Sequence, residues 1–374
     1  MKKDGHYYAV LAFARACGFK KEAAHTVAYA SQFVDDAKIN HIVLIEKPAK
    51  IEFETIDNKP AFFNMATCHS YFKIKTFNFS AMTNNTCAFH FVPGCEGSSF
   101  VKKMRCKENK QVINNILRDA KEEDDLVKFG MVLHPFADTF THEGFSGILS
   151  KVNDIKDCKP KKVSIILLKF IARIMLLFGT KKFDKYLDRI VPAYGHGQAM
   201  ENPDLPYLKW SYEYDYSDEF FEEYKKTVKD NKELFHRAFK NIKEHLEGYL
   251  SKHPEYKEDN LNFTDFDKLY KALLKRGSDK KRIKNWKKLL LEMNLLLKSD
   301  KAYKYDENLW LEQAFLNFNK KKFNERKVEY VILADKFNES NWYKYYKAVK
   351  WYKKNFFEYC KEKGLNIPNE YIVD

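Results

Sequence analysis

The spacing of apolar positions predicts helices over most of this chain of 374 residues. Near the N-terminus, apolar side chains recur three or four positions apart between residues 7 and 17, and Gly18 ends the run. A second helix starts near Lys20 and reaches two adjacent acids, Asp35 and Asp36. Neighbouring side chains on a helix point in different directions. Only one of these carboxylates can therefore face inward, and the pattern leaves open which one.

A different pattern occupies residues 40–93, where short runs alternate between apolar and polar positions. Residues 51–56 and 72–79 alternate in this way, which is typical of strands or extended loops. Helical spacing returns after this segment, and two helices are expected between residues 108 and 144. We therefore expect a mostly α protein, with a helical bundle core and a small β or extended insert near residues 40–93.

The chain is expected to form two regions. Residues 1–215 contain the histidine and aspartate motifs described below and form a helical domain. Residues 216–374 form a basic, strongly charged helical region that packs on the first. Helices in this second region are predicted at residues 217–252, 263–275, 280–298, 306–320 and 338–363.

The helix expected to end near residue 144 carries His134, Asp138 and His142 at positions i, i+4 and i+8. At about 100° per residue these side chains lie within roughly 80° of arc, on one face. Apolar neighbours direct that face toward the interior, where polar groups need partners. The α-carbons of His134 and His142 lie about 12 Å apart, too far for both rings to bind one ion. We predict two metal ions, one at each His, with the Asp138 carboxylate between them; the alternative is a set of hydrogen-bonded core residues.

Three further histidines lie in distant segments. His69 and His90 each stand among apolar residues in the extended insert and are either metal ligands or hydrogen-bonded core residues. His196 lies in a loop dense in Gly and Pro that also contains acidic residues. Because loops held by a rigid scaffold often carry functional residues, His196 is a candidate ligand.

The cysteines and the N-terminal sequence indicate the cellular compartment of the protein. The seven cysteines are scattered without C-x-x-C spacing, which argues against a disulfide framework or a zinc knuckle and favours reduced cytosolic thiols. The N-terminus lacks the apolar core of a secretory signal, so we expect a cytoplasmic protein. The most apolar run, residues 163–178, is too short and too charged to span a membrane. It is expected to form a buried helix or a helix that lies on anionic lipid.

Charge and motifs narrow the function classes. The formal net charge of +14 favours phosphate-rich partners such as nucleic acid or anionic lipid, although the interleaved acids are more typical of a solvated, lysine-rich surface. The chain lacks a G-x-S-x-G elbow, a P-loop, a strand-linked G-x-G-x-x-G and a His-Asp dipeptide. Serine hydrolases, nucleoside triphosphatases and HD-domain phosphohydrolases are therefore disfavoured.

Four segments resemble an uncharacterised bacterial family known only as a domain of unknown function: residues 6–8, 29–36 and 133–147, and His196 with residues 203–210. More distantly, the order of these residues is similar to zinc-dependent phospholipases C and fungal zinc nucleases, where a helical bundle holds up to three zinc ions and a helical Asp bridges them. Those enzymes place five residues between this Asp and the next His, whereas this chain has three. The resemblance implies the following metal ligands: His6, Asp35 or Asp36, His69, His134, Asp138, His142 and His196.

These observations lead us to expect an intracellular metal-dependent hydrolase, a phosphoesterase that uses two or three zinc-type ions to activate water. Asp138 is the expected catalytic carboxylate, and Glu143 or Glu201 can orient the site or accept a proton. The substrate would contain phosphate, as a lipid, a nucleotide or a nucleic acid. The alternative is a non-catalytic protein whose basic C-terminal half binds nucleic acid or an anionic membrane surface.

Overall fold

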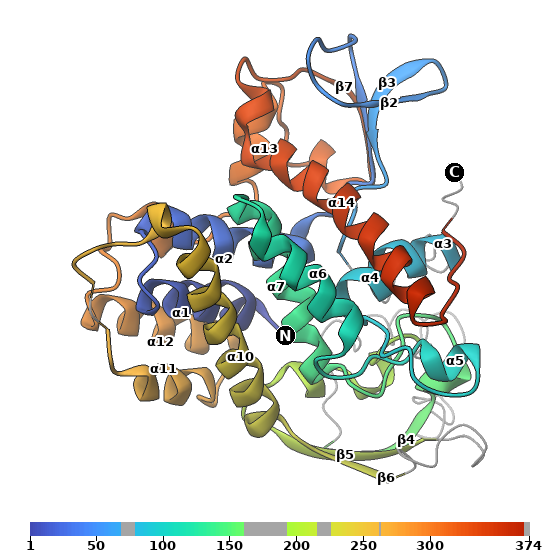
Figure 1. Cartoon of the computed structure of the whole chain (residues 1–374), viewed down its shortest axis with the longest axis vertical. Coiled ribbons are helices and arrows are strands. Elements are labelled where there is room, and N and C mark those ends of the chain that lie inside the picture. The colour runs from blue at the N-terminus through green and yellow to red at the C-terminus, as the bar shows by residue number, and fades with distance from the viewer. Residues whose placement is uncertain (69–78, 161–192, 215–225, 262, 370–374) are drawn as a thin grey trace, which may run out of the picture.

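Helices from both halves of the chain surround α7 (Leu126–Thr141), as Figure 1 shows. The computed structural model describes residues 1–68, 79–160, 193–214, 226–261 and 263–369. The longer helices are α1 (Val10–Ala16), α2 (Lys21–Asp36), α6 (Gln111–Glu122), α10 (Asn231–Lys252), α11 (Phe266–Leu273), α12 (Asp279–Glu292) and α14 (Asn341–Glu362). Short α and π segments are η1 (Asp4–Ala9), α3 (Phe79–Ala81), η3 (Met82–Cys87), α4 (Ala88–His90), α5 (Phe100–Lys103) and α13 (Leu309–Ala314). Single 3-10 turns are η4 (Lys151–Asn153), η5 (Gly197–Ala199), η6 (Asn202–Asp204), η8 (Pro254–Tyr256), η9 (Lys301–Tyr303), η10 (Lys322–Asn324) and η11 (Phe337–Glu339).

The local sequence sets both ends of α7. Asp125 Oδ1 accepts hydrogen bonds from the backbone N–H groups of Val127 and Lys128, each at 3.0 Å, and so caps the helix. After the last turn, Gly144 has a φ of +94°, a conformation that glycine adopts readily. Residues 127–141 are all buried because α2, α4, α6, α10 and α14 pack around them.

Gly130 brings α7 into close contact with α2. A Cβ atom at this position would lie 2.3 Å from the Val27 carbonyl oxygen of α2, so only glycine permits the approach. His134 lies one turn further along α7, and its Nδ1 reaches the Ser31 carbonyl oxygen of α2 at 2.8 Å. The tight helix crossing therefore positions a histidine of the predicted stripe.

Two sheets flank the helices. One has the strand order β2-β3-β1-β7 and the other β4-β5-β6. The strands are β1 (His41–Leu44), β2 (Glu54–Ile56), β3 (Lys59–Phe63), β4 (Ile155–Lys159), β5 (Lys209–Tyr214), β6 (Lys226–Asp230) and β7 (Lys327–Val331). β1 and β7 run parallel, with Ile42 opposite Val328, and the other pairs are antiparallel. In Figure 1 the first sheet lies beside α13 and α14, and the second lies at the opposite end of the molecule.

The protein is therefore a mixed α/β fold, and the expected mostly α helical bundle with a single insert near residues 40–93 is wrong. Four of the seven described strands, β4 to β7, lie outside that insert. In β5, Trp210, Tyr212 and Tyr214 alternate as buried residues, a period-two pattern in a stretch for which no strand was expected. β6 and β7 are charged and half exposed, which also suits a solvated helix face, and their pairing depends on residues distant in sequence.

The helices predicted at residues 263–275, 280–298 and 338–363 are confirmed as α11, α12 and α14. The helix predicted at residues 217–252 is confirmed only as α10, because residues 226–230 form β6. The helix expected at residues 306–320 is wrong in extent, because α13 occupies six residues there. The two helices expected between residues 108 and 144 are α6 and α7. Residues 72–78, 163–178 and 217–225 lie outside the described residues.

One apolar core includes residues from both expected regions. It extends from Met1 to Ile367, and a smaller cluster packs around Phe145 and Trp210. The pairing of β1 with β7 also joins the first 215 residues to the rest of the chain. Among the helices that the structure describes, no helix combines the length and apolar character needed to cross a bilayer.

Candidate metal centre

Histidine and aspartate side chains from five segments converge beside the C-terminal half of α7. The segments are η1, the end of α2, α4, α7 and the loop after residue 193. Together they contribute His6, Asp35, His90, His134, Asp138, His142, His196 and Asp204. The histidines and Asp138 are buried, whereas the Asp35 and Asp204 side chains are 32% and 16% exposed.

The Asp138 carboxylate lies at the junction of these segments. Its Oδ1 lies 2.6 Å from the Met1 amino nitrogen and 3.1 Å from His6 Nε2. Its Oδ2 lies 3.2 Å from His90 Nδ1 and 3.3 Å from His134 Nε2. The two oxygens of one buried carboxylate therefore face two different groups of nitrogen atoms.

Backbone carbonyls fix the tautomers of His90 and His134. His134 Nδ1 lies 2.8 Å from the Ser31 carbonyl oxygen, and His90 Nε2 lies 3.0 Å from the Thr67 carbonyl oxygen. A carbonyl oxygen only accepts hydrogen bonds, so these two nitrogens donate protons. In neutral rings the remaining nitrogens carry lone pairs, and they face each other at 3.2 Å. Hydrogen bonds of this kind commonly orient histidines that bind metals.

The ligand atoms around His90 and His134 have the spacing of a four-coordinate site. Zinc–nitrogen bonds of about 2.0 Å place tetrahedral ligand atoms about 3.3 Å apart. His90 Nδ1, His134 Nε2 and Asp138 Oδ2 are separated by 3.2, 3.2 and 3.3 Å. Asp35 Oδ1 lies 3.7 Å from His134 Nε2 and 4.0 Å from His90 Nδ1. Asp35, His90 and His134 form one set of atoms that could hold a metal ion, and Asp138 Oδ2 lies within 3.3 Å of both ring nitrogens. We call these four atoms the His90–His134 group.

A second group lies on the Oδ1 side of Asp138. The His6 ring stacks on the His134 ring with centroids 3.7 Å apart. His6 Nδ1 is buried and has no hydrogen-bond partner among the residues that the structure describes. The Met1 amino nitrogen lies 2.6 Å from Asp138 Oδ1 and 3.1 Å from Asp204 Oδ1. Burial alone would lower the pKa of this amine, but the two carboxylates raise it to about 11.

A third group is formed by His142, His196 and Asp204. His142 Nδ1 donates to the His90 carbonyl oxygen at 2.8 Å, which leaves Nε2 3.3 Å from Asp204 Oδ1. His196 Nδ1 donates to the Met200 carbonyl oxygen at 3.0 Å, and its Nε2 lies 3.8 Å from Asp204 Oδ2. Because Asp204 also contacts the N-terminal amine, it connects this group to the second one.

Burial and charge set the protonation of these residues. Burial lowers the pKa of His6, His134 and His196 to about 4, so these rings are neutral near pH 7. Burial alone would raise the pKa of Asp138, but His142, the N-terminal amine and other nearby rings hold it well below its usual range. Burial alone would lower the pKa of His90 as well, but its hydrogen bond to Asp138 and the charge of that carboxylate raise it. The centre thus combines an ionised Asp138 carboxylate with the neutral rings of His6, His134 and His196, and a metal ion at His90 Nδ1 would displace a proton.

Six of the predicted ligands belong to this cluster: His6, Asp35, His134, Asp138, His142 and His196. His134 and His142 belong to different groups: His142 Nε2 lies 3.3 Å from Asp204 Oδ1, whereas its Nδ1 lies 3.6 Å from Asp138 Oδ2. His69 lies outside the described residues.

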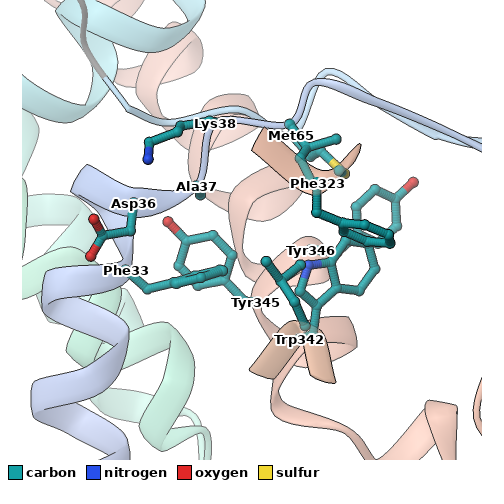
Figure 2. Close-up of a pocket in the computed structure, with 11 residues that line it drawn as sticks. Phe33, Asp36, Ala37, Lys38, Met65, Phe323, Trp342, Tyr345 and Tyr346 are labelled. Atoms are coloured by element: carbon teal, nitrogen blue, oxygen red, sulfur yellow. The ribbon is translucent and has the colours of Figure 1, made fainter. Parts of the chain in front are cut away.

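Asp36, the neighbour of Asp35, points away from the cluster. Its Oδ2 accepts a hydrogen bond from the Tyr305 hydroxyl at 2.6 Å. It lines a pocket of about 30 Å³, and Figure 2 shows Asp36 and Lys38 at one side of this pocket and Trp342 at the other. The carboxylate of the pair that faces the candidate centre is therefore Asp35.

The two glutamates considered as proton acceptors are both held in ion pairs. Glu143 Oε2 lies 2.8 Å from Lys229 Nζ, just beyond the end of α7. Glu201 Oε2 lies 3.0 Å from Lys2 Nζ. Neither carboxylate belongs to the three groups described above.

Three groups of the cluster could not be assigned as site residues from the sequence alone. His90 stands between two phenylalanines in a segment expected to be extended, so only its apolar surroundings marked it as a possible ligand. Asp204 follows His196 by eight residues in the same loop, which was a usable signal. The Met1 amine has no side-chain signature, and only the packing of η1 against α2 reveals its place.

Comparison with known proteins places the chain in a family but gives it no activity. No curated protein and no solved structure has significant similarity to this chain. A family model described as a family of unknown function, DUF6765, matches residues 1–360. The match extends well beyond the first 215 residues, which contain the four segments that resemble such a family. The chain therefore belongs to the DUF6765 family of unknown function.

Proposed function

We propose that the protein is a metal-dependent hydrolase that acts on phosphate esters. The observation that carries this proposal is the His90–His134 group. Two ring nitrogens face each other at 3.2 Å while the opposite nitrogen of each ring donates to a backbone carbonyl. Two lone pairs at this distance repel each other in a buried site unless a proton or a metal cation lies between them. The Asp138 and Asp35 carboxylates beside them add negative charge that favours a divalent cation over a single proton.

The donor chemistry favours zinc or a similar first-row ion. The candidate groups offer imidazole nitrogens and carboxylate oxygens and contain no cysteine, a set that suits zinc-type ions. Asp138 joins the first and second groups, and Asp204 joins the second and third. This connectivity supports a centre of two or three ions.

Ions of this type lower the pKa of bound water toward 7 and stabilise negative charge that develops on a phosphoryl oxygen. The chain supplies the framework for that chemistry. Gln32 Nε2 lies 3.4 Å from Asp35 Oδ2 and so helps direct Oδ1 toward the centre. Because Asp35 and Asp204 are partly exposed while the histidines are buried, reactants have access through the carboxylate-lined edges of the centre.

The positive surface supports a phosphate-containing substrate. The formal net charge of +14 attracts anions to the protein and raises their local concentration. Phosphodiester or phosphomonoester oxygens also match the hard, charged character of divalent ions, which stabilise both the attacking and the leaving oxygen in two-metal sites.

Hydrolysis assays with metal-depleted protein test this proposal. Protein treated with a chelator and dialysed would be assayed on bis(p-nitrophenyl) phosphate and p-nitrophenyl phosphate, before and after addition of Zn²⁺, Mn²⁺ or Ca²⁺. We expect activity that depends on one of these ions and falls at least a hundredfold in His134→Ala. The matched control is His236→Ala, which removes an exposed histidine of α10. No hydrolysis of either ester with any ion, or equal activity in both variants, would contradict the proposal.

A further inference from the structure

The exposed face of α12 carries a groove bordered by lysines. Four of them, Lys280, Lys284, Lys287 and Lys288, surround a groove of about 490 Å³. Lys284, Lys287 and Lys288 follow Lys280 by four, seven and eight positions, which places all four on one face of the helix. On the opposite face of α12, Arg282, Trp286 and Leu290 are buried. These residues hold the helix so that its lysine face points outward.

This face has an unbalanced positive charge. Lys280, Lys284 and Lys287 have no carboxylate within 4.0 Å among the residues that the structure describes, and only Lys288 forms an ion pair, with Glu292 at 3.3 Å. Burial, followed by the charge of Lys304, lowers the pKa of Lys287. An anionic partner would relieve this repulsion.

The floor of the groove is apolar. It is formed by Ile283, Leu291 and Tyr303, and Lys287 Nζ lies 4.9 Å from the centroid of the Tyr303 ring. Just after the helix, Leu297 is 58% exposed. Apolar side chains next to a row of lysines are typical of helices that lie at a membrane interface, where acyl chains and anionic head groups are both available.

We propose that the lysine face of α12 docks the protein on an anionic phospholipid surface. Clusters of four to eight basic residues on such a helix commonly bind acidic head groups. The geometry favours lipid over nucleic acid because a sugar–phosphate backbone has no apolar group to fill the groove floor. Base stacking requires an accessible ring, and the Lys287 ammonium group already covers the face of Tyr303.

The buried side of α12 connects this helix to the candidate metal centre. Arg282, on the buried side of α12, forms two hydrogen bonds to Asp4 at 2.6 and 2.9 Å. Asp4 begins η1, which carries His6 into the centre. A bilayer bound to the lysine face would therefore be separated from the N-terminal segment of the site by the width of α12, about 10 Å. The docking proposal does not depend on the proposed hydrolysis.

Vesicle co-sedimentation with the full chain tests the proposal. Vesicles of phosphatidylcholine alone would be compared with vesicles that contain about one-third phosphatidylglycerol. We expect binding to the anionic vesicles only, with a steep loss as salt is added. In the triple variant Lys280→Glu, Lys284→Glu, Lys288→Glu, affinity is expected to fall about a hundredfold. Leu297→Ser should weaken binding without changing the charge.

A second triple variant controls for net charge. Lys320→Glu, Lys321→Glu, Lys322→Glu changes the charge by the same amount at another exposed site, and we expect it to retain binding within about twofold. Circular dichroism would verify that both variants are folded. Equal losses in the two variants, binding to phosphatidylcholine alone, or absence of vesicle binding at low salt would overturn the proposal. Binding of duplex DNA or RNA through the α12 lysines without vesicle binding would also overturn it.

Discussion

His90 Nδ1 and His134 Nε2 lie 3.2 Å apart in the core of the protein, and each ring donates its opposite N–H to a backbone carbonyl. This pair comes from segments 44 residues apart in sequence. Asp138 Oδ2 and Asp35 Oδ1 complete the group. A buried arrangement of four potential ligand atoms with fixed tautomers is the central structural feature of this protein.

The adjacent acids at the end of α2 should respond differently to the same substitution. Asp35→Asn removes a charged ligand atom from the His90–His134 group, so we expect a loss of metal affinity of at least tenfold. Asp36→Asn should leave metal affinity unchanged and cost about 1 kcal/mol of stability, because the hydrogen bonds that Asp36 accepts from the Tyr305 hydroxyl and the Gln32 amide are weakened. Titration with a chromophoric zinc indicator measures the difference. Equal affinities in the two variants would contradict the assignment of Asp35.

Substitution of Gly130 should disrupt the crossing of α7 and α2. Gly130→Ala would place a methyl group 2.3 Å from the Val27 carbonyl oxygen, and we expect a loss of about 3 kcal/mol in the free energy of unfolding. Gly248→Ala is the control, because a Cβ atom at this position would meet only Lys121 Nζ, at 3.9 Å. We expect this substitution to stabilise α10 by about 0.5 kcal/mol or more. Urea unfolding followed by circular dichroism distinguishes the two. Similar stabilities would show that the helices do not need this contact.

The buried ion pair of Asp4 and Arg282 should hold η1 in place. Arg282→Met leaves the Asp4 carboxylate buried without its partner, and we expect a loss of about 3–5 kcal/mol of stability. Adding Asp4→Asn to this variant should restore part of the loss because the uncompensated charge is removed. Chemical denaturation of the two single variants and the double variant tests this. A double variant as unstable as the sum of both single variants would argue against direct coupling.

The stability of the metal-free protein should depend on pH in two windows. The pKa values of His6, His134 and His196 are about 4 in the folded chain, below the ordinary histidine value of 6.5 that the unfolded chain has. The unfolded chain therefore binds more protons between these values, and stability should fall as pH decreases from 6.5 toward 4. The pKa of the Met1 amine rises from 8.0 to about 11 on folding, so its contribution is present below pH 8 and lost as pH rises toward 11. Urea unfolding across this range should give the highest stability between these windows; a maximum at or below pH 4 would contradict it.

The candidate site was predictable where its signal was local. The stripe of His134, Asp138 and His142 follows from helix periodicity, and α7 forms as expected. The choice between Asp35 and Asp36 required the tertiary structure, because helix periodicity shows that one faces inward but not which one. His90 was visible only as a histidine among apolar residues, and its backbone bond to Thr67 depends on a contact across 23 residues.

The sheets were less predictable than the central helix. β1 pairs with β7 almost 300 residues later. A short, charged strand such as β7 gains its stability from this long-range pairing and not from a strong local preference. β5 was the exception, since its alternating aromatic residues carry a strand signal in the sequence itself. No strand was expected at residues 209–214, although the alternation is present there.

Metal analysis of protein purified without chelators tests the central claim most directly. We expect at least one equivalent of a transition metal per chain by plasma mass spectrometry. His90→Ala, which removes a ligand atom of the His90–His134 group, should lose at least one equivalent, whereas His236→Ala should keep the full content. Less than about half an equivalent in the unmodified protein, or equal metal content in the two variants, would contradict the assignment of this group as a metal site.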